Sequence, residues 1–66
     1  MDTIGFLKVM VIEEKGAREK YQLAAEMAED PETRAMFEKL RDEEAFHIQF
    51  LEGEYDRLEK LRTASR

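Results

Sequence analysis

The 66-residue chain contains no cysteine, one proline and three glycines. The absence of cysteine excludes disulfides and thiolate metal sites. Few glycines and prolines, with a charged fraction of 41% and an apolar fraction of 42%, are typical of long amphipathic helices and not of a β-sheet or a disordered tail. A chain this short buries too small a core to be stable alone. We therefore expect stabilisation by a metal bound to histidine and carboxylate, by a partner chain, or by both.

Long apolar runs and an excess of basic charge are also missing. The longest apolar run, Val9–Ile12, is far too short to cross a bilayer. The first residues lack the basic region and apolar stretch of a signal peptide. The net charge of −5 leaves no basic face for nucleic acid. We expect a cytoplasmic protein with neither a nucleic-acid nor a membrane partner.

One break divides the chain. The segment 29–32, Glu-Asp-Pro-Glu, predicts a helix end, an Asp N-cap and a proline at the first helical position. Residues 1–66 are therefore predicted to form a single all-α domain: a helix over about 3–28, a turn at 29–30, a helix over about 31–61 and a frayed end from 62. This antiparallel hairpin cannot cover both of its apolar faces. The simplest closed solution is a symmetric dimer that forms a four-helix bundle.

Each predicted helix carries a glutamate in the middle of its apolar stripe. Glu14 is central on the first helix and Glu44 on the second, and the single histidine, His47, lies one turn after Glu44 on the same face. The first stripe consists of Ile4, Leu7, Met10, Val11, Ala17, Tyr21, Ala24, Ala25 and Ala28. The second consists of Met36, Phe37, Leu40, Ile48, Leu51, Tyr55 and Leu58.

The two glutamates are also predicted to lie at the same height in the hairpin, because both are about 15 residues from the turn. A twofold axis would then gather two copies each of Glu14, Glu44 and His47, which is the ligand set of a di-metal carboxylate site. Burying unpaired carboxylates costs several kcal/mol, which bound cations would offset. Carboxylate and imidazole ligands suit iron or manganese, and zinc would also bind.

Simpler interpretations exist for each of these residues. Because twelve of the 66 residues are Glu, a Glu three positions before any His arises by chance about one time in five. A histidine on an apolar face is more often a core residue, and Glu14 and Glu44 can reach the rim of the hairpin instead. The three features together nevertheless favour a metal site. Tyr21, two turns after Glu14, is either a packing aromatic or a hydroxyl bonded to a metal-bound carboxylate of the opposite chain.

Apolar residues also occupy the backs of both predicted helices. Phe46 and Phe50 lie well off the stripe of Glu44, and a cluster lies opposite Glu14: Val9, Ile12, Gly16, Leu23 and Met27. Scattered apolar residues are common on the surfaces of small proteins. A helix that is apolar on two sides normally contacts two neighbours, so these residues favour a further interface.

Several segments together resemble the rubrerythrin branch of the ferritin-like superfamily. They are residues 14–21 (Glu-Lys-Gly-Ala-Arg-Glu-Lys-Tyr), 24–26 (Ala-Ala-Glu), 30–31 (Asp-Pro), 37–40 (Phe-Glu-Lys-Leu) and 43–47 (Glu-Glu-Ala-Phe-His). The resemblance extends from about Glu13 to Leu58. It implies that Glu14, Glu44 and His47 are iron ligands and that Tyr21 is the tyrosine that supports them.

The chain also departs from that family. A typical member has four helices and two such motifs, whereas this chain has one motif and resembles half a domain. Encapsulated ferritins are similar in having two-helix chains whose dimers build the di-iron site and then join into rings. That likeness implies a homodimer and a higher homo-oligomer, with an encapsulating shell protein as partner and a protein nanocompartment as location. Nothing here replaces the cysteine-rich rubredoxin domain of rubrerythrins, so peroxide reduction by that route lacks support.

Two functional hypotheses follow. The first is a ferroxidase-type oxidoreductase, in which a di-iron centre shared between two chains oxidises Fe(II) with dioxygen or peroxide. Glu14 and Glu44 would bind and bridge the irons, His47 would cap each iron, and acidic residues nearby would attract cations; these are Glu13, Asp42 and Glu43. The second hypothesis is a non-catalytic helical hairpin that mediates oligomerisation, with structural metal or none.

Overall fold

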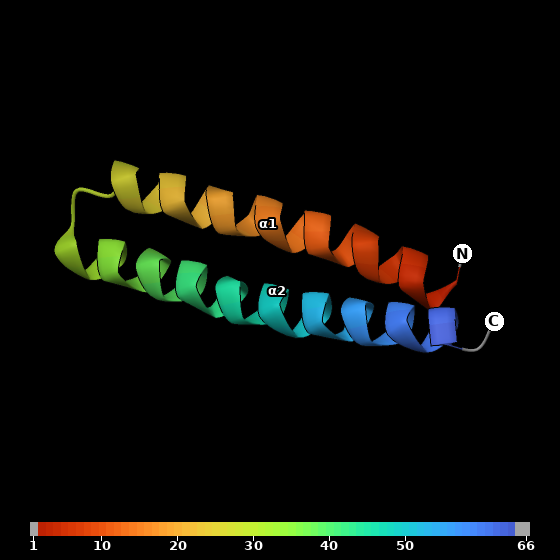
Figure 1. Ribbon diagram of the computed structural model, residues 1–66. Coiled ribbons are helices and arrows are strands. Elements are labelled where there is room, and N and C mark those ends of the chain that lie inside the picture. The colour runs from red at the N-terminus through yellow and green to blue at the C-terminus, as the bar shows by residue number, and fades with distance from the viewer. Residues whose placement is uncertain (1, 65–66) are drawn as a thin grey trace.

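The computed structural model describes residues 2–64 and contains two helices over this range, α1 (Thr3–Met27) and α2 (Pro31–Ala64). Figure 1 shows the helices side by side and antiparallel, with the connection at one end of the molecule and both chain ends at the other. The all-α hairpin predicted from the sequence is confirmed. Within residues 2–64 neither helix is long and apolar enough to cross a membrane.

The break between the helices is held by side-chain and backbone hydrogen bonds. Ala28 adopts an extended backbone conformation and ends α1, and its carbonyl oxygen accepts a hydrogen bond from Arg34 Nη2 at 2.8 Å. Asp30 Oδ2 accepts from the Thr33 N–H at 2.8 Å and from the Thr33 hydroxyl at 3.0 Å, while Pro31 opens α2. These contacts are those of an N-cap followed by proline, so the predicted cap is confirmed.

The end of α2 differs from the prediction. Fraying was expected from residue 62, but the helix continues to Ala64. The reason is local: Arg62 Nη2 pairs with Glu59 Oε1 at 2.7 Å, and the Thr63 hydroxyl donates to the Glu59 carbonyl at 2.9 Å. Both bonds go to Glu59, which lies one turn earlier in the helix, where helical spacing brings it into reach. Residues 65–66, which were also expected to fray, lie outside the described residues.

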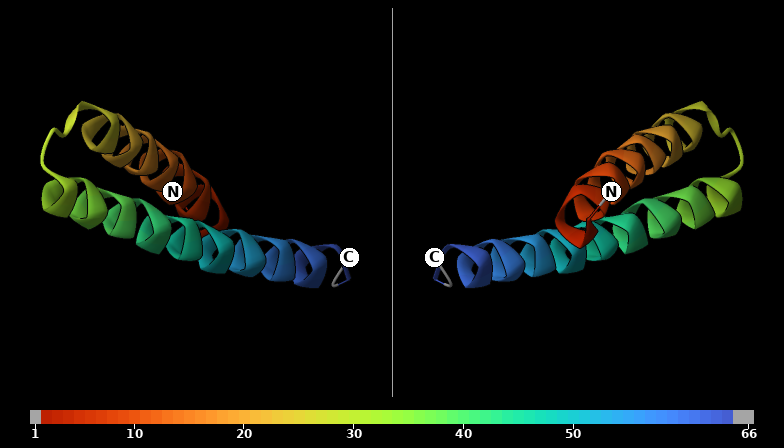
Figure 2. Two further views of the ribbon diagram at one scale, coloured as in Figure 1. Left: turned by 90° about the vertical axis from the view of Figure 1, so that its left-hand side faces the viewer. Right: turned by 90° about the vertical axis from the view of Figure 1, so that its right-hand side faces the viewer.

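The hairpin is a single layer, with extents of 55 × 18 × 11 Å, and its thinnest dimension is about that of one helix. Figure 2 shows the two helices inclined to one another with nothing packed over either side. Among the described residues only Leu7, Ala25 and Ile48 are buried. The accessible surface is 5197 Å², roughly 800 Å² more than the size law for compact monomers gives at this mass. The chain therefore exposes an interface-sized excess of surface.

The two sides of this layer differ in chemistry. On one side, which we call the charged face, polar groups link the helices: Lys15 Nζ lies 3.6 Å from Glu52 Oε2, and Arg41 Nη1 donates to Gln22 Oε1 at 2.7 Å. Each residue of a helix is rotated by about 100° from the one before it. Counted from the buried Leu7 and Ile48, this rotation places half-buried, mostly aliphatic side chains on the other side of the layer. We call it the apolar face; it comprises Met10, Ala17, Tyr21, Ala24, Leu40, Leu51 and Leu58.

The cap at the turn makes a measurable contribution to stability. Replacing Asp30 with Ala removes both hydrogen bonds to Thr33, and we expect the midpoint of thermal unfolding at pH 7 to fall by a few degrees. Circular dichroism melts of the parent, Asp30→Ala and the control Asp56→Ala measure the effect, since Asp56 is an exposed acid within α2. If Asp30→Ala lowers the midpoint of thermal unfolding no more than Asp56→Ala does, the cap contributes nothing to stability.

The same contribution depends on pH. The backbone N–H of Thr33, and after it the Thr33 hydroxyl, hold the pKa of Asp30 below its ordinary value of 3.8. A folded-state pKa below the unfolded one means that the stabilisation is present above the unfolded pKa and is lost as the pH falls through the folded pKa. The gap between the melting midpoints of the parent and Asp30→Ala should therefore be full at neutral pH and shrink below pH 3.8.

Candidate metal centre

The hairpin brings together the three residues that the sequence predicts as metal ligands. Glu14 comes from α1, and Glu44 and His47 come from α2; one ligand atom of each lies within 4.8 Å of the others. His47 Nδ1 is 3.5 Å from Glu44 Oε2 and 3.8 Å from Glu14 Oε2. The cluster lies where the two helices face each other and opens toward the apolar face, because His47 projects from the helix seam on that side.

Burial differs strongly among the three side chains. Glu44 is the deepest, with 15% of its side chain exposed, followed by Glu14 with 32%, while 54% of the His47 side chain is exposed. Glu13 is exposed, as the sequence predicts. One hairpin therefore encloses the carboxylates of the cluster and leaves its imidazole open to whatever covers the apolar face.

One carboxylate oxygen of this cluster is left without a hydrogen bond. Glu44 Oε2 is buried and no donor within the described residues bonds to it, since the 3.5 Å to His47 Nδ1 does not meet hydrogen-bond geometry. A buried acceptor left unpaired costs about 1–3 kcal/mol. A second carboxylate, that of Glu14, lies in the same cluster and adds like-charge repulsion. A positive charge beside the two carboxylates, from a protonated His47 or a bound metal ion, would offset both costs.

The donor set fits a transition-metal ion. Two carboxylate oxygens and one imidazole nitrogen are ligands that iron, manganese and zinc accept. With metal–ligand bonds of about 2.0–2.2 Å, neighbouring ligands lie about 3.0–3.4 Å apart. The observed separations of His47 Nδ1 from Glu44 Oε2 and Glu14 Oε2, 3.5 and 3.8 Å, are slightly wider. Small side-chain rotations would bring these atoms into the range. Three protein ligands leave coordination positions open for a further group.

Other residues singled out in the sequence lie outside the cluster. Tyr21 is half-buried on the apolar face, two turns or about 10 Å along α1 from Glu14. Within residues 2–64 its hydroxyl makes no hydrogen bond, so nothing in one hairpin ties it to the ligands. Asp42, expected to attract cations, is already paired with Arg41 Nη2 at 2.9 Å, whereas Glu13 and Glu43 are exposed.

Comparisons with known proteins give no match. No family model matches the chain, no curated protein is significantly similar to it, and no solved structure is significantly similar to the hairpin. The resemblance to rubrerythrins, from about Glu13 to Leu58, therefore stays a prediction.

The unpaired oxygen of Glu44 gives the cluster a testable signature. In metal-free protein, Glu44→Met removes a desolvated acceptor and a like charge beside Glu14, so we expect stability to rise by about 1–3 kcal/mol. Added Zn²⁺ or Mn²⁺ should raise the melting midpoint of the parent, because a ligand of the folded state stabilises it, and leave that of the variant unchanged. Thermal melts in EDTA and in excess metal measure both effects.

Glu43→Met is the matched control for this test. It makes the same substitution one residue earlier, at an exposed position outside the cluster, and should leave the response to metal intact. Glu44 is instead a structural residue if Glu44→Met destabilises the metal-free protein and metal still stabilises parent and variant alike.

Proposed function

We propose that this chain is half of a di-iron carboxylate centre, which a second copy of the chain completes, and that the centre oxidises Fe(II). The observation that carries the proposal is the buried, unpaired Glu44 Oε2 beside Glu14 and His47. A cation at this position would remove the cost of the unpaired acceptor and the repulsion between the two carboxylates. The donor set suits iron or manganese, and zinc would also bind.

The need for a second copy rests on surface area and on ligand number. The excess exposed surface of roughly 800 Å² is what one partner contributes to a standard protein interface. His47 is the most exposed ligand and lies toward the apolar face. A twofold axis through that face would set two clusters opposite each other and supply four carboxylates and two imidazoles to two ions, within a four-helix bundle.

Each residue then has a defined part in holding the ions. Glu14 and Glu44 would hold the ions through their carboxylates, and His47 would supply an imidazole ligand in each half. Tyr21 of the partner, two turns along α1, orients a bound carboxylate by donating a hydrogen bond. Two bound Fe(II) ions would each supply one electron to dioxygen, which would take up two protons and leave as hydrogen peroxide.

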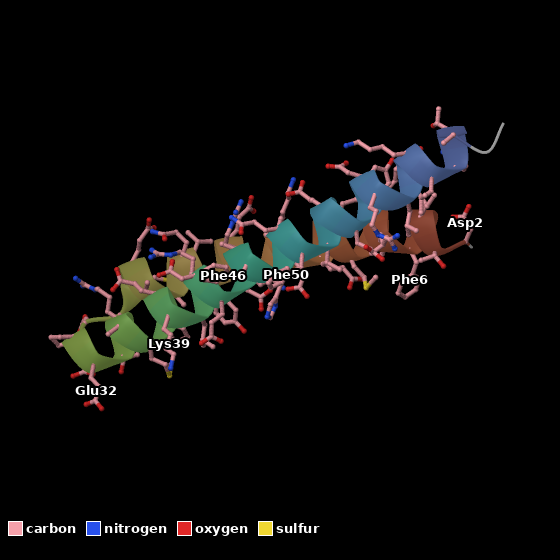
Figure 3. The ribbon with its side chains drawn as sticks, turned by 60° about the horizontal axis from the view of Figure 1, so that its bottom comes forward. Asp2, Phe6, Glu32, Lys39, Phe46 and Phe50 are labelled. Atoms are coloured by element: carbon pink, nitrogen blue, oxygen red, sulfur yellow. The ribbon has the colours of Figure 1, made fainter. Side chains whose placement is uncertain are left out.

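A second candidate function is a hairpin that serves only for oligomerisation. It is favoured by the apolar side chains that lie exposed away from the cluster, including Ile12 at 71% and Phe50 at 73%. Figure 3 shows Phe46 and Phe50 on the side of α2 turned away from α1. Metal, if bound, would then be structural. A cytoplasmic location, a higher homo-oligomer and a shell protein as partner stay predictions from the sequence and from the resemblance.

Iron loading with turnover distinguishes these two functions. Protein loaded with Fe(II) without oxygen should bind one ion per chain, because each chain supplies half of the ligands. On exposure to air it should consume about one dioxygen per two Fe(II), as the electron balance above requires. Elemental analysis, an oxygen electrode and the absorbance of oxo-bridged ferric iron measure these quantities.

Two variants make the outcome specific to the cluster. His47→Ala should lose binding at both ions equally, since the twofold axis makes them equivalent, and should lose oxygen uptake. Glu43→Gln, an exposed neighbour of Glu44, should behave as the parent. Binding of one ion per chain without oxygen uptake would favour the structural role of the metal, and clearly less than one ion per chain would count against the site itself.

A further inference from the structure

The side of α1 that faces away from α2 carries an apolar stripe that the proposed metal centre does not use. Val9, Gly16 and Leu23 repeat every seven residues, with Ile12 and Met27 beside them. The four side chains of this set are exposed, from 37% for Val9 and 58% for Leu23 to 71% for Ile12 and 79% for Met27, while Gly16 is half-buried. We call these five residues the outer stripe of α1. Leu7 and Ala25, which pack against α2, lie on the opposite side of the helix.

Gly16 has no purpose within a single hairpin. A glycine inside a helix lowers helix stability relative to alanine, so a packing reason is expected for it. A Cβ atom built on Gly16 meets nothing within 4 Å, and its φ is not positive, so neither space nor backbone conformation requires glycine. The close approach of a second backbone from outside the hairpin would supply such a reason.

The charges beside the stripe are ordered along the helix. On one flank, Lys8 and Lys15 occupy the N-terminal half of α1, and Glu19 and Glu26 occupy the C-terminal half. In an antiparallel helix pair related by a twofold axis, the same flank of each helix meets on one side. An axis passing beside Ala17 sets Lys8 opposite Glu26 and Lys15 opposite Glu19, because each pair is symmetric about residue 17. Within one hairpin Lys15 Nζ lies 3.6 Å from Glu52 Oε2 and Lys8 Nζ lies 5.6 Å from the centre of the Tyr55 ring, so both flexible side chains would turn from these contacts to meet the partner.

The other flank gives nearly the same register. Glu13 and Lys20 are the charged residues there, and they are symmetric about a point between Gly16 and Ala17. An axis beside Ala17 also brings Ile12 within one residue of the position opposite the partner's Leu23, and it places Gly16 one residue from the crossing, where two helices come closest. Both flanks, this apolar pair and the glycine thus agree, to within about one residue, on one antiparallel arrangement of two α1 helices.

We propose that the outer stripe of α1 packs antiparallel against the outer stripe of another copy of this chain. This interface is separate from the apolar face and uses none of Glu14, Glu44 or His47. Self-complementary charge commits the partner to a second copy, because a different protein would have no reason to match both flanks about the same point. Where both interfaces form, the chain assembles beyond a dimer.

A charge swap tests the pairing of Lys8 with Glu26. Lys8→Glu alone and Glu26→Lys alone each place like charges opposite each other twice per interface. Each variant should sediment with no more than half the mass of the parent at low salt, and an equimolar mixture of the two variants should recover the parental mass. Lys60→Glu, the same change at an exposed site on α2, should keep the parental mass. Circular dichroism verifies that every variant stays helical.

The close approach at Gly16 is tested by a bulkier residue. Gly16→Leu improves helix propensity yet should reduce the assembly as Lys8→Glu does. Asp56→Leu, at an exposed position on another side of α2, should not. The inference is overturned if all of these variants keep the parental mass, or if the mixture of charge variants fails to reassemble. Iron bound per chain, measured in parallel, should stay constant, so failure of this interface and failure of the metal centre give different results.

Discussion

A layer that is one helix thick cannot enclose a core, and this constraint governs the whole molecule. Each helix of the hairpin has one neighbour, so only Leu7, Ala25 and Ile48 become buried among the described residues. Burial of apolar area is the dominant stabilising term in folding, and three buried side chains supply little of it. The apolar face and the outer stripe of α1 are the surfaces on which a second chain can supply the rest.

The same constraint explains where the polar cluster lies. A charge cannot be isolated from water in a single layer except along the seam between the two helices. Glu14 and Glu44 occupy that seam, and His47 leaves it toward the apolar face. The seam shields Glu44 enough to leave one of its oxygens unpaired while His47 stays accessible to a second copy. Burial thus decreases across the cluster from Glu44 through Glu14 to His47.

Much of this arrangement follows from sequence. Asp30 and Pro31 mark the break, and equal distances from it place Glu14 and Glu44 at one height, because both helices rise by the same amount per residue. The polar contacts that hold the register, Arg41 to Gln22 and Lys15 to Glu52, do not follow. They depend on the rotation of each helix about its axis, which a stripe of apolar residues defines only coarsely.

The relative burial of the ligands and the end of α2 were beyond sequence reasoning for a similar reason. A helical wheel centres both Glu14 and Glu44, yet the exposed fraction of the Glu44 side chain, 15%, is about half that of Glu14, 32%. Composition at the C-terminus predicts fraying, but specific bonds from Arg62 and Thr63 to Glu59 extend the helix to Ala64. Such pairs are common in sequences rich in Glu and Arg, so their presence alone has little predictive value.

The most direct test of a metal centre shared between two chains is anomalous diffraction at the iron absorption edge from crystals grown with Fe(II). The proposed centre predicts two anomalous peaks related by a twofold axis, each within bonding distance of Glu14, Glu44 and His47, with at least one carboxylate bridging between chains. Crystals of the same iron-treated protein that lack a peak at this cluster, or that bind iron only through one chain at the surface, would contradict it.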